Sequence, residues 1–366
     1  MHRLVSHWFD PDFARKTLLV PAMTATREPS VGRVWHDAAA RPSFSRDVRP
    51  CIISFADLYA WHIPDALVTD QFLVHDARNL YCDSSIMVSG ASAEKVGQAC
   101  QNLANRFSAI PPRPVVEDHA DELALVLHNE GGGTWGHYLV QMFPKVLLFC
   151  ERFPKGKVIV PETYAAGNSS FSQLFDLYGI SRDRLIGVDG DKTYRIGEAI
   201  LLDFPFDFAH GAIHPAALDL LDRFEHAMAP AVTPQGAYVR RLPHAARATV
   251  NQEQVAAELA TVGIPAMTMG DRSVQDQAAM WHDHGLIVGT LGSDLANIVF
   301  ARPGSRVLVL SPDWFGDTFF YNLATARGIH WHEIRCGRMG ERVEPERHSS
   351  FNVDIGSLRT VLASLA

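Results

Sequence analysis

The stretch that decides the fold is residues 238–310, YVRRLPHAARATVNQEQVAAELATVGIP followed after a short gap by SVQDQAAMWHDHGLIVGTLGSDLANIVFARPGSRVLVL. Residues 286–290 and 306–310 are continuous apolar runs, as expected for strands that are buried on both faces. Helical segments separate the apolar runs along this stretch. The resulting β-α-β-α-β-α-β order predicts a parallel sheet covered by helices on both faces.

Capping residues mark where the two clearest helices of this stretch begin. Asn251 has Gln254 three residues later, and Ser273 has Asp276 at the same spacing, which is the pattern of a capping box. Gly263 follows the first of these helices and is a natural stop signal. We therefore expect a helix within residues 251–263 and another that begins at Ser273.

The preceding residues alternate strand-like and helix-like segments less clearly. Residues 1–50 contain five prolines and are expected to be irregular. Strands are expected near residues 52–55, 71–75, 86–88, 123–128, 157–160, 185–188 and 199–203. Helices are expected near residues 94–107, 136–153, 170–178 and 215–226.

A linker near residues 230–236 divides the chain into two expected domains. Residues 1–229 are expected to form the first Rossmann-like domain. Residues 230–366 form the second, which binds the nucleotide and whose last helix can pack back on the first. The predicted fold class is thus α/β, with a cleft between two Rossmann-like domains.

Bulk composition excludes several classes of protein. With 366 residues, 47% hydrophobic and 20% charged, the chain has the composition of a globular protein rather than a disordered one. A net charge of −8 argues against nucleic acid as the main partner, because phosphate backbones require a basic surface. The five cysteines lack a CxxC spacing, which argues against a zinc site or a disulfide framework.

No apolar run reaches the roughly 18–20 residues of a membrane span. The N-terminus has no signal-peptide core either. We therefore expect a cytoplasmic protein, and a peripheral membrane association stays open. The residues from Pro230 onward carry no lysine, so every cation there is an arginine, the side chain suited to forked phosphate contacts. This bias has a second explanation, because lysine is scarce throughout the chain.

Gly292 and Ser293 lie between a predicted buried strand and a helix. In a parallel sheet, ligands bind at the carboxyl ends of the strands, and the N–H groups at a helix start suit a phosphate. The alternative is an ordinary strand-to-helix turn. Asp294 either caps the helix start, where an acid is favoured, or acts on a sugar or acceptor hydroxyl.

Three arginines follow the first strand of the 238–310 stretch. Placed opposite Gly292 and Ser293, the side chains of Arg240, Arg241 and Arg247 would neutralise a diphosphate. The alternative is a solvated loop held by ion pairs. Asn251 is expected to cap the next helix and is also a candidate ligand.

His137 follows a glycine-rich loop in the sequence WGHYL. A histidine at this place is a candidate general base for a hydroxyl group, although any one of 17 histidines is more often structural. Metal sites look poor. The candidates are the pairs Asp10/Asp12, Asp189/Asp191, His282/His284 and His330/His332, and none has a convincing ligand spacing.

The ordered set of motifs from residue 136 to residue 310 resembles glycosyltransferase family 61. The resemblance begins at Gly136-His137-Tyr138-Leu139 and continues at Phe143-Pro144-Lys145. It includes the strand with Arg240 and Arg241, the segment of Arg247 with Asn251 and Gln252, and Gln277 before an apolar helix. Its last motif falls on Val288, Gly289, Gly292, Ser293, Leu295, Asn297 and Phe300, followed by Pro303-Gly304.

The resemblance implies a GT-B fold, in which the domain of residues 1–229 lies on the acceptor side. It also implies inverting transfer from a nucleotide sugar, no required metal, and no cofactor besides the UDP- or GDP-linked donor. It assigns donor binding to Gln277, Gly292, Ser293 and Asn297, along with the arginines and Asn251. The chain departs from the family pattern in having Leu291 where the family has a histidine.

The expected function is therefore sugar transfer to a glycan or glycolipid hydroxyl, with His137 or Asp294 as the base. Two alternatives remain at this stage. One is another GT-B-like enzyme that modifies polysaccharides, such as a pyruvyl transferase. The other is an inactive relative that serves as a scaffold, which the leucine at position 291 encourages.

Overall fold

The computed structural model of the chain divides into two compact units. The first unit comprises Met1–Ala25 and Ile53–Ala227, and the second comprises Thr26–Ile52 and Met228–Ala366. The second unit therefore includes a segment from the N-terminal part of the chain. The structure describes residues 2–5, 14–27, 34–36, 50–82, 93–111, 113–127, 131–167, 169–190, 192–208, 210–227, 236–241, 249–315, 318–338 and 349–365.

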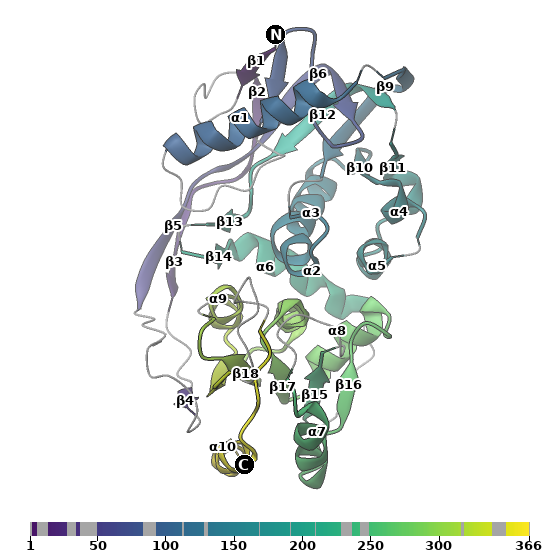
Figure 1. Cartoon of the computed structure of the whole chain (residues 1–366). Helices are drawn as coiled ribbons and strands as arrows, with labels where there is room; N and C mark the ends of the chain where they lie inside the picture. Colours follow the sequence, from purple (N-terminus) through teal and green to yellow (C-terminus); the bar gives the residue numbers. More distant parts are fainter. Residues whose placement is uncertain are drawn as a thin grey trace. The chain divides into compact units, whose positions relative to one another are not determined.

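Nine of the described strands form one mixed sheet in the first unit, shown in purple to teal in Figure 1. They are β1 (Arg3–Val5), β2 (Arg15–Val20), β6 (Leu58–Thr69), β7 (Val74–His75), β8 (Asn79–Tyr81), β9 (Val115–Val126), β10 (Lys157–Pro161), β11 (Leu185–Val188) and β12 (Thr193–Leu202). The strands β12, β9, β10 and β11 lie side by side in parallel, whereas β6 pairs antiparallel with β12, β2 and β7. The first unit thus joins a parallel α/β half to an antiparallel half.

The first unit also contains helices, some of which connect its parallel strands. They are α1 (Ala93–Ala109), α2 (Trp135–His137), the π-helical turn η1 (Tyr138–Met142), α3 (Phe143–Arg152), α4 (Glu162–Ala165), α5 (Ser170–Leu177), η2 (Arg182–Arg184), α6 (Pro215–Leu221) and η3 (Asp222–Ala227). Two small ribbons complete the described elements, β13 (Phe206–Asp207) with β14 (Ala212–Ile213) and β3 (Met23–Arg27) with β5 (Cys51–Phe55). The predicted long helix after residue 136 is therefore three consecutive segments, and Pro144 lies in the first turn of α3.

The second unit contains a six-stranded parallel sheet, whose strands are shown in green and yellow in Figure 1 except for β4, which is purple. Its strands are β15 (Ala237–Arg240), β16 (Ala266–Thr268), β17 (Leu286–Thr290), β18 (Arg306–Pro312), β19 (His330–Cys336) and β4 (Val34–His36). Its helices are α7 (Gln252–Thr261), α8 (Val274–Asp283), the 3₁₀ helix η4 (Ser293–Phe300), α9 (Phe319–Ala326) and α10 (Ile355–Leu365). Every strand pair in this sheet is parallel, which confirms the prediction for residues 238–310.

Helices cover both faces of this second sheet. The α7 and α10 helices pack on one face, where Leu259 and Leu358 join a core with strand residues such as Leu308. On the other face η4 packs against α8 and α9, and Tyr321 of α9 contacts Trp331 of β19 edge to face. The last helix therefore belongs to the core of the second unit.

Several expectations from the sequence are wrong. The first fifty residues are not simply irregular, because β1, β2, β3 and β4 lie among their described parts. The 12-residue strand β6 was not expected, since Pro64 and Asp65 interrupt its sequence. The strand continues through Pro64 and Asp65, and Asp65 adopts the left-handed region with a φ of 50°. The strand expected at residues 86–88 lies outside the described residues.

The described residues contain no helix that is long and apolar enough to cross a bilayer.

Candidate functional site

The order of the strands in the second sheet places a switch point between β15 and β17. Along the sheet the order is β16-β15-β17-β18-β19, so the chain first moves one way from β15 and then returns to continue in the other direction. In doubly wound sheets, ligands bind at the carboxyl ends of the strands that flank this reversal. Arg241 directly follows β15, and Leu291 and Gly292 directly follow β17. The topology therefore brings together two segments that the sequence had selected.

Arg241 lies directly against the backbone that follows β17. Its Nη1 donates a hydrogen bond to the carbonyl oxygen of Leu291 at 3.3 Å. A Cβ atom built on Gly292 would lie 1.4 Å from the same Nη1. Gly292 has an extended backbone with φ of 173°, so its conformation does not require glycine, but a Cβ atom there would displace the end of the Arg241 side chain.

The guanidinium of Arg241 retains hydrogen-bonding capacity. Its Nε atom is buried and has no hydrogen-bond partner in the structure. Burial lowers the pKa of Arg241 from its ordinary value, and the charge of nearby Asp294 acts in the opposite direction. A buried donor without a partner costs free energy, and an anionic ligand would satisfy it.

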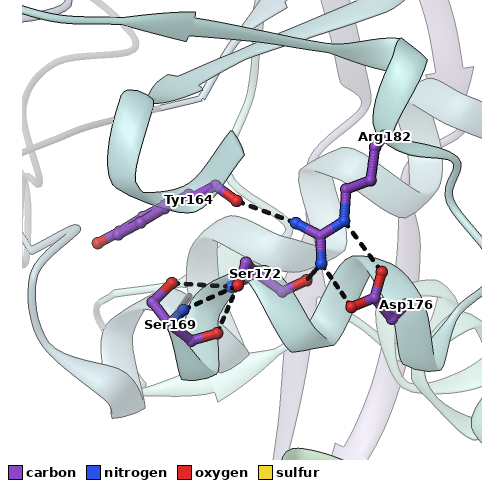
Figure 2. A network of polar contacts seen from close by, with 5 residues as sticks. All are labelled: Tyr164, Ser169, Ser172, Asp176 and Arg182. Carbon is purple, nitrogen blue, oxygen red and sulfur yellow. Dashed lines mark hydrogen bonds and ion pairs between the residues drawn. The ribbon is translucent and has the colours of Figure 1, made fainter. Parts of the chain in front are cut away.

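Arg182 in the first unit is an arginine with a structural role and serves as a comparison for Arg241. Figure 2 shows its guanidinium clamped between Asp176 and two carbonyl groups. Its Nε donates to Asp176 at 3.0 Å, its Nη1 to the carbonyl of Tyr164 at 3.1 Å, and its Nη2 to that of Ser172 at 3.0 Å. Each of its three nitrogens has a partner, so that Arg182 ties α4, α5 and η2 together. Among the described residues, the guanidinium of Arg241 makes one hydrogen bond, to Leu291.

Ser293 and Asp294 begin η4, at the N-terminal end where backbone N–H groups lack partners within the helix. Both side chains are partly buried. Burial raises the pKa of Asp294 above its ordinary value, and the charge of Arg241 partly offsets this. A bound phosphate and the Asp294 carboxylate would compete for Arg241, unless Asp294 acts on another part of the substrate.

The amide side chains of Gln277 and Asn297 are bonded to each other. Asn297 is fully buried and its Nδ2 donates to Oε1 of Gln277 at 2.9 Å. Gln277, which is 6% exposed, donates from Nε2 to the carbonyl groups of Met269 and Arg272, both at 3.1 Å. The hydrogen bonds of these two predicted donor-binding residues thus run within the protein.

Two other predicted ligands are engaged elsewhere. Arg240 forms an ion pair with Glu253 of α7 at 3.0 Å. Asn251 occupies the predicted N-cap position of α7, but its side chain does not make the expected capping hydrogen bond. Its amide instead accepts from the backbone N–H of Val353 at 3.0 Å and donates to the carbonyl of Val353 at 2.8 Å. The backbone of Val353 in the C-terminal segment therefore binds the Asn251 amide in place of the local cap. The Ser273 cap is confirmed, with the N–H of Asp276 donating to Oγ at 3.1 Å.

Some predicted residues cannot be placed. Arg247 and the pair Asp10/Asp12 lie outside the described residues, as does Asp191. Within the part of the chain that the structure describes, no three histidine, cysteine or acidic side chains gather closely enough to hold a metal ion.

In the first unit, His137 ends α2 and directly precedes the π-helical turn η1. Insertions of this type are frequent at functional sites. The imidazole Nδ1 and Oε1 of Gln141 are 2.9 Å apart. This oxygen favours the tautomer with the proton on Nδ1, so that Nε2 carries the basic lone pair. That arrangement suits a general base.

Gln141, which contacts His137, was not selected from the sequence, and Lys145 was named only as part of the Phe143-Pro144-Lys145 motif. Gln141 is buried, and its spacing of four residues from His137 on a helix was the available signal. Lys145 of α3 is 2% exposed, with its ammonium 3.3 Å from the ring centroid of Phe204. A buried cation over an aromatic face was not predictable, because Phe204 is distant in sequence.

Comparison with known families gives one match. Residues 135–308 match the family model described as Glycosyltransferase 61. The matched segment begins just before His137 and includes Arg241, Gly292, Ser293 and Asp294. A comparison with curated proteins found no match.

Proposed function

This chain belongs to the glycosyltransferase 61 family, and we propose that it transfers a sugar from a nucleoside diphosphate donor to a hydroxyl group of a glycan or glycolipid. The observation that carries the proposal is the position of Arg241 at the switch point of a parallel sheet, against a glycine that leaves no room for a side chain. A diphosphate needs both a cation and a close backbone approach, and this pair of residues supplies both.

The proposed reaction is an inverting displacement without a required metal. The acceptor oxygen attacks the anomeric carbon on the face opposite the diphosphate, the bond from that carbon to the diphosphate oxygen breaks, and the base takes the hydroxyl proton. Arg241 and the N–H groups at the start of η4 would stabilise the negative charge that develops on the leaving diphosphate. His137 and Asp294 are the two candidates for the base.

Other parts of the expectation remain within this proposal. They are a GT-B arrangement, a UDP- or GDP-linked donor, a cytoplasmic location with or without peripheral membrane association, and a phosphate contact from Arg247. Arg240 contributes less to diphosphate binding than Arg241, because Glu253 already neutralises it.

Nucleotide binding tests the site directly. We expect UDP or GDP to raise the melting temperature, because a ligand that binds only the folded state stabilises it. The Arg241→Ala variant should weaken the calorimetric Kd by about 10- to 150-fold, which corresponds to roughly 1.5–3 kcal/mol for a charge-assisted bond. Arg240→Ala is the matched control, with the same change of charge one residue away and a smaller expected loss.

Unchanged nucleotide binding by Arg241→Ala would overturn the phosphate role. A wild-type protein that ignores all nucleoside diphosphates and nucleotide sugars would favour the pyruvyl transferase or the scaffold. Leu291 bears on the scaffold alternative, because its side chain is fully buried and has no polar group that could contact a donor.

A further inference from the structure

We propose that Gln277 and Asn297 are positioning residues, a buried amide pair that sets the start of η4 without touching the donor. The inference rests on the proposed function, because it concerns how the nucleotide site is built. It assigns these two residues a role other than ligand binding.

Three hydrogen bonds fix the orientation of the Gln277 amide. Nε2 of Gln277 donates to the carbonyl groups of Met269 and Arg272, so the Oε1 atom must face the other way. That oxygen accepts from Nδ2 of Asn297. Turning the Gln277 amide over would set its oxygen against two carbonyl oxygens, which leaves only one workable orientation.

The pair links segments that lie at the same edge of the sheet. Met269 and Arg272 lie in the turn that follows β16, where the N–H of Arg272 donates to the carbonyl of Met269 at 3.0 Å. Gln277 lies on α8, and Asn297 lies in η4, four residues after Ser293. The bonds therefore hold η4 to α8 and to the turn after β16, and so fix where the free N–H groups of η4 lie.

Burial argues against a direct contact with the donor. Asn297 is fully buried and Gln277 is 6% exposed, so little of either side chain is open to a ligand. Hydrogen-bonded buried amides favour one packing arrangement, because breaking a bond of such a pair leaves a buried polar group unsatisfied. This is the property that a positioning pair needs.

A double-mutant cycle tests the pair through the UDP Kd, measured at least 15 °C below the lowest melting temperature. Gln277→Ala and Asn297→Ala should each weaken UDP binding by roughly three- to tenfold. The double variant should bind UDP about as well as the single variant with the lower affinity. The exposed Gln101–Asn105 pair of α1, with an amide hydrogen bond of 3.2 Å, is the matched control. Its double alanine variant should leave the Kd unchanged.

Three outcomes overturn the proposal in distinguishable ways. Additive losses in the double variant would mean that each amide contacts the nucleotide itself. A lower melting temperature with an unchanged Kd would mean a role in stability alone. If the wild-type protein binds no nucleoside diphosphate, the proposed function fails, and hydrogen exchange then decides: the backbone N–H groups of Ser293 and Asp294 should exchange at least tenfold faster in Gln277→Ala. Unchanged exchange would overturn the positioning role.

Discussion

Replacing Gly292 by alanine should disable Arg241 without changing Arg241 itself. The backbone of Gly292 is extended, so alanine adopts it without strain. The new methyl carbon, however, would be placed 1.4 Å from Nη1 and 2.7 Å from Cζ of Arg241. Since non-bonded carbon and nitrogen atoms prefer a separation of about 3.5 Å, the guanidinium must move by about 2 Å.

The magnitude follows from what Arg241 loses when it moves. Its bond to the carbonyl of Leu291 is long, at 3.3 Å, so the unfolding free energy should fall by at most about 0.5–1.5 kcal/mol. A diphosphate contact is charge-assisted, so its loss should weaken the Kd by about 10- to 150-fold. Gly292→Ala is thus expected to retain its fold and to lose nucleotide affinity.

Calorimetry with UDP or GDP, combined with a double-mutant cycle, checks this reasoning. In the Arg241→Ala background the methyl group has nothing to displace, so Gly292→Ala should cause little further loss of affinity. Two additive losses would show that the methyl group blocks the phosphate itself. Full affinity in the single variant would refute the assigned place of Arg241.

Three further predictions follow from the site and the folded state. His137→Ala should reduce turnover by about 10²–10⁴-fold while the UDP Kd stays constant, and wild-type turnover would leave Asp294 as the base. Arg335→Met leaves Glu333, which is fully buried and 2.9 Å from Arg335, without its counter-charge. Urea unfolding should show that the free energy of unfolding falls by about 3–5 kcal/mol, and a fall of less than about 1 kcal/mol would contradict this. Burial raises the pKa of Asp76, but hydrogen bonds from Tyr81 and from nearby amide groups outweigh it and lower the pKa to about 2. Because the folded-state pKa lies below the unfolded value near 3.9, the ionised group stabilises the fold above about pH 4, and this contribution is lost as the pH falls toward 2. The free energy of unfolding of Asp76→Asn should lack that part of the pH dependence. A pH profile identical to that of the wild-type protein would contradict the argument.

The sequence predicted the second unit well because its signals there are local and agree with one another. The strand at residues 286–290 is a continuous apolar run, and it is found with those bounds as β17. The first fifty residues failed for the opposite reason: a three-residue strand such as β4 carries almost no local signal and exists because β19 offers a partner. The prediction missed β6 since Pro64 normally ends a strand.

For the candidate site, the sequence could predict which residues lie at strand ends but not which partners their side chains bind. Arg240 and Arg241 are neighbours with the same chemistry, yet one pairs with Glu253 and the other lies against Gly292. Asn251 caps nothing because the backbone of Val353, about a hundred residues away, competes for its amide. Such competition is set by tertiary packing and leaves no trace in local spacing.

The edge strand β4 has a consequence for how the protein is made. It emerges from the ribosome early, but its neighbour β19 follows only near the end of synthesis, which at about 5–20 residues per second means a delay of tens of seconds. The second sheet is therefore completed only after almost the whole polypeptide has been translated. A truncated gene that starts after the first unit would yield a product with β19 bare, and a bare edge strand invites aggregation. Fusing residues 26–52 to such a fragment should restore its solubility.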